Sequence, residues 1–340
     1  MYYCGIDLAN VTSAICIVDE ADGVVLERTV KTEERELVLA LRGHGALRVV
    51  IEASPLAEWV SRLLEGAGHE VVIIDPRAAK HLVSSKKKTD ARDARTLARL
   101  CRSGWYTEVH RKSEESRELR SRLQARQALM RVKRLTGSSI RGLLRAHGIR
   151  VGKVSESRFA ERVRELVREE VPGLQVELES LLEVWESSYR AETAQERAMD
   201  RESRQDEVTR LLRTVPSVGG QLSTAFRATI DDPRRFRRGE EVGDYVGLTP
   251  RVYQSGEVEY RGRITREGDK LLRWLLVEAA HNLLTRGQDC ALKRWGKRLE
   301  RRKGSAKAKV AVARKLAILL WRIWLRREPF QAWPEGQPAS

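Results

Sequence analysis

The first 75 residues alternate short apolar segments with amphipathic ones, and this alternation limits the folds that the chain can adopt. Five segments rich in β-forming residues are expected as strands: YYCGIDLA, SAICIVDE, VVLERTV, LRVVIEA and HEVVIID. The pair Asp22-Gly23 is a hairpin turn signal between the second and the third of them. Helices are expected over Glu33–Leu41 and in LAEWVSRLLEGAG, which follows Pro55 and ends in glycine. Strands that alternate with helices predict an α/β sheet with helices on its faces.

Beyond this region the pattern changes, and the chain divides into three domains and a short tail. We assign residues 1–104 to the α/β domain, 105–213 to a helical spacer, 214–330 to a mainly α-helical C-terminal domain and 331–340 to a frayed tail.

The helical spacer carries an apolar stripe at helical spacing. The stripe comprises Leu178, Leu181, Leu182, Trp185 and Tyr189. It weakens further on, because Glu192 and Glu196 occupy the positions that would continue it. We interpret the spacer as coiled-coil-like and the stripe as an oligomer contact.

Charge is high and unevenly distributed. The net charge is +16, and the segment from Arg286 to Lys315 holds twelve Lys or Arg residues against only Asp289 and Glu300. Such a cluster indicates a polyanionic partner, most simply nucleic acid. A solvated helical face is the alternative interpretation.

Other features favour a cytoplasmic protein. The four cysteines show no paired spacing, so neither a disulfide framework nor a zinc site is predicted. The N-terminus has no basic leader followed by an apolar stretch, so no signal peptide is expected. The most apolar segment, Val310–Leu325, is too short and too charged to span a membrane.

The segment TVPSVGGQLSTA, residues 214–225, suggests a helix-hairpin-helix motif. Its Pro/Gly turn joins two expected helices, and the backbone N–H groups around Gly219 and Gly220 could bind a phosphate without reading base sequence. Many turns between helices contain glycine, so this signal does not identify a ligand by itself.

Four carboxylates stand out in the α/β domain. Asp7 lies in an apolar strand, Glu52 ends another, and Asp90 and Asp93 share one face of an expected helix. Each could serve only as a turn cap, a helix cap or a first-turn acid. Together they could converge at one edge of the sheet, where oxygen ligands suit Mg²⁺ or Mn²⁺. Two such ions roughly 3.5–4 Å apart would act on a phosphodiester.

These motifs resemble the RuvC-like (RNase H-like) nuclease fold and, more closely, the DEDD-type insertion-sequence transposases, which include pilin-gene invertases and bridge-RNA-guided recombinases. At the N-terminal end the resemblance rests on GIDLANVTSAICIVD, VVIEAS, VVIIDPRAAK and KTDARDARTLARL. At the C-terminal end it rests on VPSVGGQLSTAF, FRRGEEVGDYVGLTP, SGEVEYRGRITREGDKLLRWLLVEAA and AVARKLAILLW. The family's metal-binding acids correspond to Asp7, Glu52, Asp90 and Asp93. One departure is Ser217, where the family usually has glycine.

The resemblance also gives a role to Ser255, which precedes Gly256. Taken alone, an exposed Ser-Gly pair indicates a turn, and no G-x-S-x-G motif surrounds it. In the family, the serine of this motif is the proposed nucleophile that becomes linked to DNA. Residues expected to bind the DNA backbone nearby are Lys86, Lys87, Lys88, Arg263, Arg266, Lys270 and Arg273.

The resemblance implies an assembly as well as a chemistry. It implies a composite site, with the acids from one protomer and the serine from another, and therefore a homodimer that becomes a tetramer on two synapsed DNAs. A structured non-coding RNA would choose donor and target DNA. Two alternatives remain open: a metal-dependent junction nuclease in which water attacks, and a non-catalytic nucleic-acid-binding scaffold.

Overall fold

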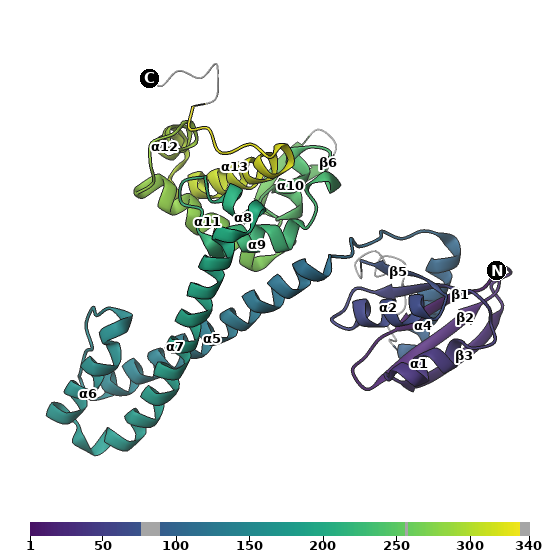
Figure 1. The fold of residues 1–340 in the computed structure, drawn as a ribbon, viewed down its shortest axis with the longest axis horizontal. Coiled ribbons are helices and arrows are strands. Elements are labelled where there is room, and N and C mark those ends of the chain that lie inside the picture. The colour runs from purple at the N-terminus through teal and green to yellow at the C-terminus, as the bar shows by residue number, and fades with distance from the viewer. Residues whose placement is uncertain (76–88, 256–257, 334–340) are drawn as a thin grey trace. The chain divides into compact units, whose positions relative to one another are not determined.

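The structure is a computed structural model, and it describes residues 1–75, 89–255 and 258–333, with the side chains of residues 252–261 outside the description (Figure 1). The chain divides into two compact units, Met1–Lys112 and Ser113–Ser340. The predicted division, an α/β region followed by a mostly helical remainder, is confirmed.

The first unit is built on a mixed five-stranded sheet with strand order β3-β2-β1-β4-β5. Its strands are β1 (Tyr3–Asp7), β2 (Thr12–Val18), β3 (Val24–Lys31), β4 (Arg48–Glu52) and β5 (Glu70–Ile74). The first three are antiparallel neighbours, whereas β1, β4 and β5 run parallel to one another. Within residues 1–75 and 89–112, the helices that accompany the sheet are α1 (Glu34–Leu41), α2 (Ala57–Gly66) and α4 (Asp90–Ser103).

The sheet separates two apolar layers. On one side, α1 and α2 contribute Leu37, Leu41, Val60 and Leu64 to a fully buried cluster with the strands. On the other side, Leu97 and Cys101 of α4 pack against the strands. Burial of these side chains provides the main force that holds the helices on the sheet.

The first unit ends later than the predicted boundary at residue 104. After α4, residues 107–109 run along β5: Asp75 N donates to Thr107 O at 3.1 Å and Val109 N to Ile73 O at 2.8 Å. Arg111 then pairs with Glu58 and Glu65 of α2. These contacts attach the segment to the sheet domain and extend that domain to Lys112.

The second unit begins with a long helical hairpin. It comprises α5 (Glu114–Ala146), the 3₁₀ turn Glu156–Arg158, α6 (Phe159–Glu170), the 3₁₀ turn Pro172–Leu174 and α7 (Gln175–Gln205). Helices α5 and α7 lie side by side (Figure 1).

The predicted apolar stripe of α7 packs within its own chain. Leu178, Leu182 and Trp185 are buried in a cluster with Ile140 and Leu144 of α5 and with side chains of α6. The stripe is therefore covered in cis, and it does not provide the oligomer contact that we expected of it.

The rest of the unit is a helical bundle with one small hairpin. Its helices are α8 (Glu207–Leu212), α9 (Gly220–Ile230), the 3₁₀ turn Pro233–Arg235, α10 (Gly239–Tyr245), α11 (Lys270–Thr285), α12 (Ala291–Lys303) and α13 (Ser305–Arg326). Helix α13 packs against α10, α11 and α12, and Phe226 of α9 is fully buried in the same core. The strands β6 (Pro250–Ser255) and β7 (Val258–Ile264) form an antiparallel pair that the sequence analysis did not predict.

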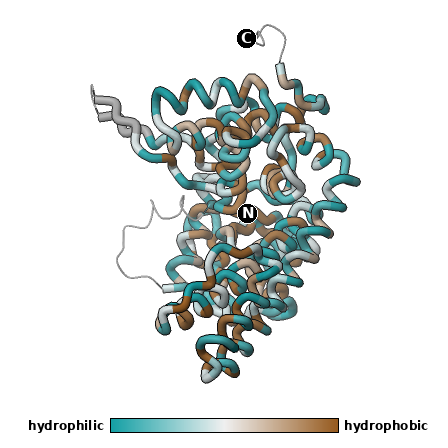
Figure 2. Tube along the Cα trace, turned by 90° about the vertical axis from the view of Figure 1, so that its left-hand side faces the viewer, coloured by the Kyte–Doolittle hydropathy of each residue, from teal (hydrophilic) through white to brown (hydrophobic). Residues whose placement is uncertain are grey.

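Hydrophobic and hydrophilic residues alternate along the helical trace, as amphipathic helices require (Figure 2). Among the described residues, no helix combines the length and the apolar character needed to cross a membrane. All four cysteines are buried and free, and burial raises the pKa of Cys101 to about 12. Such a thiol stays protonated near neutral pH.

Candidate active site

Two of the predicted acids end neighbouring parallel strands. Ile6 of β1 is paired with Ile51 of β4, so Asp7 and Glu52 are the next residues along the two strands, at the same carboxyl edge of the sheet. Both side chains are half-buried. The carboxyl edge of parallel strands is where α/β proteins commonly bind ligands.

Helix α4 brings the other two acids toward that edge. It crosses the sheet over Gly5, where a Cβ atom would overlap the backbone of Ala94 and Ala98. At its C-terminal end, Cys101 Sγ donates to the carbonyl of Arg48 at 3.2 Å, at the start of β4. The helix therefore runs antiparallel to β1 and β4, and its first turn points toward their carboxyl ends.

Asp90 and Asp93 lie in that first turn of α4. Asp90 is exposed and Asp93 is half-buried. The opposite end of α4 is fixed at the β2–β3 hairpin, where Arg99 and Arg102 pair with Asp22 at 3.0 and 3.4 Å. These contacts set the direction of the helix and so the edge on which the two acids lie.

A fifth carboxylate at this edge escaped the sequence analysis. Asp75 directly follows β5, whose last residue, Ile74, is paired with Glu52. A signal was present, because the acid follows the apolar run VVII just as Glu52 follows RVVI. The carboxyl ends of all three parallel strands thus carry an acid.

The chemistry of these side chains fits a hard divalent cation, since all of them offer carboxylate oxygens. Within the part of the chain that the structure describes, however, no three His, Cys, Asp or Glu side chains are gathered as ligands of a metal ion. Asp7, Glu52 and Asp93 each make another polar interaction.

The predicted nucleophile lies in the other unit. Ser255 is the last residue of β6 and is paired with Val258 of β7, so its backbone lies at the tip of the hairpin.

The basic residues that follow the hairpin differ in their contacts. Arg263, Arg266 and Lys270 are exposed and make no ion pair within the described residues. Arg273 instead donates to the carbonyls of Val246 and Glu267 at 3.1 and 2.5 Å, and partial burial lowers the pKa of its guanidinium. Arg273 therefore fixes the loop before α11. The predicted DNA contacts Lys86, Lys87 and Lys88 lie outside the described residues.

The predicted Pro/Gly turn joins α8 to α9. Ser217 adopts a φ of 69°, in the left-handed region that favours glycine. Gly220 begins α9 and lies against α7, where a Cβ atom would overlap the hydroxyl of Ser203. Gly219, the N-cap of α9, is exposed, and the N-terminus of this helix can offer backbone N–H groups to an anion.

Comparison with known proteins adds independent information. A model described as "Transposase IS116/IS110/IS902 family" matches residues 209–295, and a DEDD transposase model of IS110 elements matches residues 4–149. The second match contains all four acids. The first contains the Gly-rich turn and Ser255.

Similar proteins extend over almost the whole chain. The chain is 28% identical to the "Transposase for insertion sequence element IS1111A" of Coxiella burnetii over 96% of this chain and 90% of that protein. It is 29% identical to a "Probable family 20 transposase" of Pseudomonas aeruginosa over 95% of this chain and 96% of that protein. It is 26% identical to the IS1328 transposase of Yersinia enterocolitica over 80% and 82% of the two chains. With a DEDD domain at its N-terminal end and the second family segment after the helical hairpin, the chain belongs to the IS116/IS110/IS902 family of insertion-sequence transposases.

Proposed function

We propose that this transposase excises and inserts its element by breaking and rejoining DNA through a covalent phosphoserine link. The observation that carries the proposal is the position of Asp7, Glu52, Asp90 and Asp93 toward one edge of the sheet. Carboxylate oxygens at one edge are the ligands that a hard divalent cation prefers.

Ser255 is the proposed nucleophile. Its Oγ attacks the scissile phosphorus and loses its proton to solvent, while one bond from phosphorus to a deoxyribose oxygen breaks and that oxygen takes up a proton. Rejoining is the reverse step with a different strand end. The phosphodiester bond energy is retained in phosphoserine, so no ATP is needed. A position at the tip of a two-stranded hairpin supports this role, because a DNA strand can approach it.

The four acids would hold Mg²⁺ or Mn²⁺, which when bound would stabilise negative charge on the reacting phosphate. Arg263, Arg266 and Lys270 are available to bind the DNA backbone, because none of them makes an ion pair within the described residues. The Gly219-Gly220 turn would bind a further phosphate as a helix-hairpin-helix motif.

Ser255 and the acids belong to different compact units, and we propose that they meet between two copies of the chain. An exposed face of α5, distinct from the face that packs on α7, could form the contact between the two copies. Its exposed residues follow alternating steps of three and four: Ala125, Ala128, Val132, Leu135, Ser139 and Gly142. This spacing is typical of a coiled-coil seam. Two dimers would form a tetramer on synapsed DNAs.

A structured non-coding RNA is the proposed source of target choice. The net charge of +16 is compatible with binding of RNA as well as DNA. Sequencing of the RNA that co-purifies with the protein tests this part, and one structured species encoded beside the gene is the expected result.

The central experiment replaces Ser255 with alanine. Recombination and the covalent protein–DNA species, detected as a protease-sensitive shift of labelled DNA on a denaturing gel, should both disappear. Ser138→Ala, at an exposed position of α5, serves as the control and should retain both. If Ser255→Ala still cleaves DNA, water is the nucleophile and the chain acts as a metal-dependent nuclease instead.

A separate variant, Asp90→Asn, tests the alternative that the protein is a non-catalytic scaffold. Asp90→Asn preserves the size of the side chain and removes its charge, so a scaffold would keep every activity. Loss of cleavage in this variant is the expected result.

A further inference from the structure

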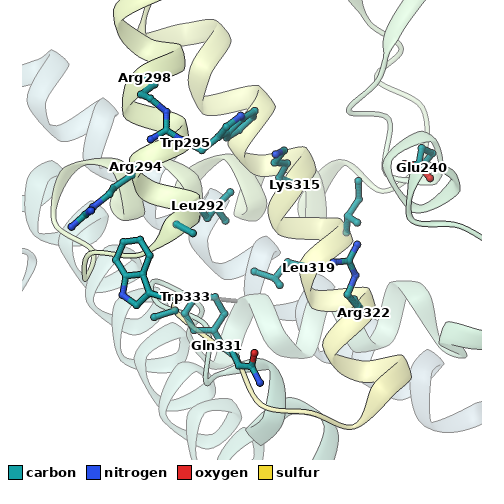
Figure 3. A pocket seen from close by; sticks show the side chains of 14 residues that line it. Glu240, Leu292, Arg294, Trp295, Arg298, Lys315, Leu319, Arg322, Gln331 and Trp333 are labelled. Carbon is teal, nitrogen blue, oxygen red and sulfur yellow. The ribbon is translucent and has the colours of Figure 1, made fainter. Parts of the chain in front are cut away.

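The second unit contains a pocket that the proposed chemistry does not use. It has a volume of about 530 Å³ and lies between α12, α13 and the segment that ends at Trp333 (Figure 3). Its walls combine the indole rings of Trp295 and Trp333 with four cationic side chains. A volume of this size is within the range of small-molecule sites.

The segment that forms one wall is fixed by hydrogen bonds. Ala291 N donates to Ala332 O at 3.0 Å, and Phe330 N donates to Thr214 Oγ1 at 2.9 Å. The guanidinium of Arg294 lies 4.6 Å from the centroid of the Trp333 ring. These backbone hydrogen bonds and the contact with Arg294 hold the Trp333 ring in place.

Three of the four cations of the pocket make no ion pair with a carboxylate of the described residues. Arg298, Lys315 and Arg322 make no ion pair with a carboxylate among the described residues, and Lys315 Nζ instead lies 4.0 Å from the centroid of the Trp295 ring. Arg294 is paired with Asp289 at 2.7 Å. Glu240 is the one carboxylate that lines the described pocket, so the walls are strongly electropositive.

This combination favours one class of ligand. Phosphate alone would need only cations, whereas indole rings stack on the face of a nucleobase. Bases in duplex DNA are stacked on their neighbours and present only their edges in the grooves. A single-stranded or extruded nucleotide offers both a free base face and a phosphate.

We propose that this pocket binds an unpaired nucleotide of a nucleic acid, with the base against Trp333 or Trp295 and the phosphate near Arg298, Lys315 and Arg322. The inference rests on nucleic-acid binding in the proposed function but not on the serine chemistry. The site lets the C-terminal bundle bind a single-stranded segment in addition to duplex.

The test measures binding of fluorescent octanucleotides of single-stranded DNA, single-stranded RNA and duplex DNA to the full-length Ser255→Ala protein without divalent metal. Trp333→Ala should weaken single-strand binding by about 5- to 100-fold, as expected for the loss of one base–aromatic stack, and should change duplex binding by less than about twofold. Whether the protein with Trp333 intact binds single-stranded DNA or single-stranded RNA more tightly identifies which nucleic acid supplies the nucleotide. Because no cleavage is measured, failure of the serine proposal leaves this test unaffected.

Matched variants keep the test decisive. Trp105→Ala removes an indole that is 77% exposed in the first unit and should leave single-strand binding unchanged. Trp295→Phe keeps an aromatic wall and should retain binding, whereas Arg322→Glu should weaken it and reduce its salt dependence. A single-strand oligonucleotide carrying 2-aminopurine should lose fluorescence on binding and recover it in the Trp333→Ala variant. Equal weakening of single strand and duplex, or no weakening by Trp333→Ala, would overturn the proposal.

Discussion

Gly5 of β1 lies directly against Ala98 of α4, so closely that a Cβ atom at Gly5 would overlap the Ala98 backbone nitrogen. Helix and strand therefore meet at backbone distance. This contact matters for the site, because α4 carries Asp90 and Asp93 to the edge where Asp7 ends β1. The absence of a side chain at residue 5 is thus a requirement of the acid arrangement.

The first prediction follows from this contact. Gly5→Ala should lower the free energy of unfolding of the first unit by about 3 kcal/mol or more, because the added methyl group meets backbone atoms that cannot rotate away. Urea unfolding followed by circular dichroism measures the change. Gly66→Ala is the matched control: nothing lies within 4 Å of a Cβ atom there, and α2 should be unchanged or slightly stabilised. Equal stability of the two variants would contradict the close packing.

The two ends of the sheet provide the second prediction. Glu52→Gln, at the carboxyl edge, should reduce DNA cleavage by about 100-fold or more, because a neutral amide is a poor ligand and cannot help to stabilise charge at the reacting phosphate. Glu70→Gln, at the amino end of β5, removes only an exposed partner of Arg48 and should leave cleavage near the wild-type rate. Cleavage rates at saturating Mg²⁺ and calorimetric titration with Mn²⁺ measure the two effects. Normal Mn²⁺ binding by Glu52→Gln would remove Glu52 from the proposed metal site.

The sheet was predictable from sequence for a physical reason. Buried parallel strands are nearly continuous apolar runs, so RVVIE and HEVVIID were visible, and an acid at the end of such a run is conspicuous. The partner of the α7 stripe was not predictable, because periodicity shows that a face is buried but not what covers it. The pocket around Trp295 and Trp333 forms because the segment after α13 folds back onto α12. No local sequence pattern predicts that contact.

The third prediction concerns Glu192, which appeared in the sequence to interrupt the stripe. In the structure it is buried and lies 2.9 Å from Arg126 and 2.5 Å from Lys133 of α5. Glu192→Ala should destabilise the second unit by about 2–3 kcal/mol, because Arg126 and Lys133 lose their buried partner and keep only the exposed carboxylates of Glu196 and Glu156. Glu202→Ala breaks the exposed pair with Arg122 in the same helical hairpin and should cost less than about 1 kcal/mol. Thermal and urea unfolding measure both changes in the free energy of unfolding. If the ion pairs of Glu192 were fully solvated, the two variants would be destabilised by the same small amount.

The fourth prediction uses the turn before α9. Ser217 has a φ of 69°, and glycine adopts this conformation without steric cost. Ser217→Gly should therefore stabilise the second unit by roughly 0.5–1 kcal/mol, after allowance for the greater entropy of glycine in the unfolded chain. Ser138→Gly makes the same chemical change inside α5 and should destabilise by roughly 0.5–1 kcal/mol. Urea unfolding measures both changes, and destabilisation by Ser217→Gly would contradict a left-handed conformation at residue 217.

The fifth prediction tests the proposed dimer seam on α5. Leu135 is 68% exposed and Val132 is 40% exposed, although both occupy core positions of the heptad pattern. Leu135→Lys should raise the dimer dissociation constant by at least about tenfold, because it places a lysine from each copy in an apolar seam of an already basic chain. Val176 of α7 is 75% exposed and lies off this face, so Val176→Lys should leave association unchanged. Sedimentation velocity over a concentration series measures both. If Leu135→Lys self-associates as the wild type does, the two copies must meet through another surface, and the serine and the acids would have to be brought together there.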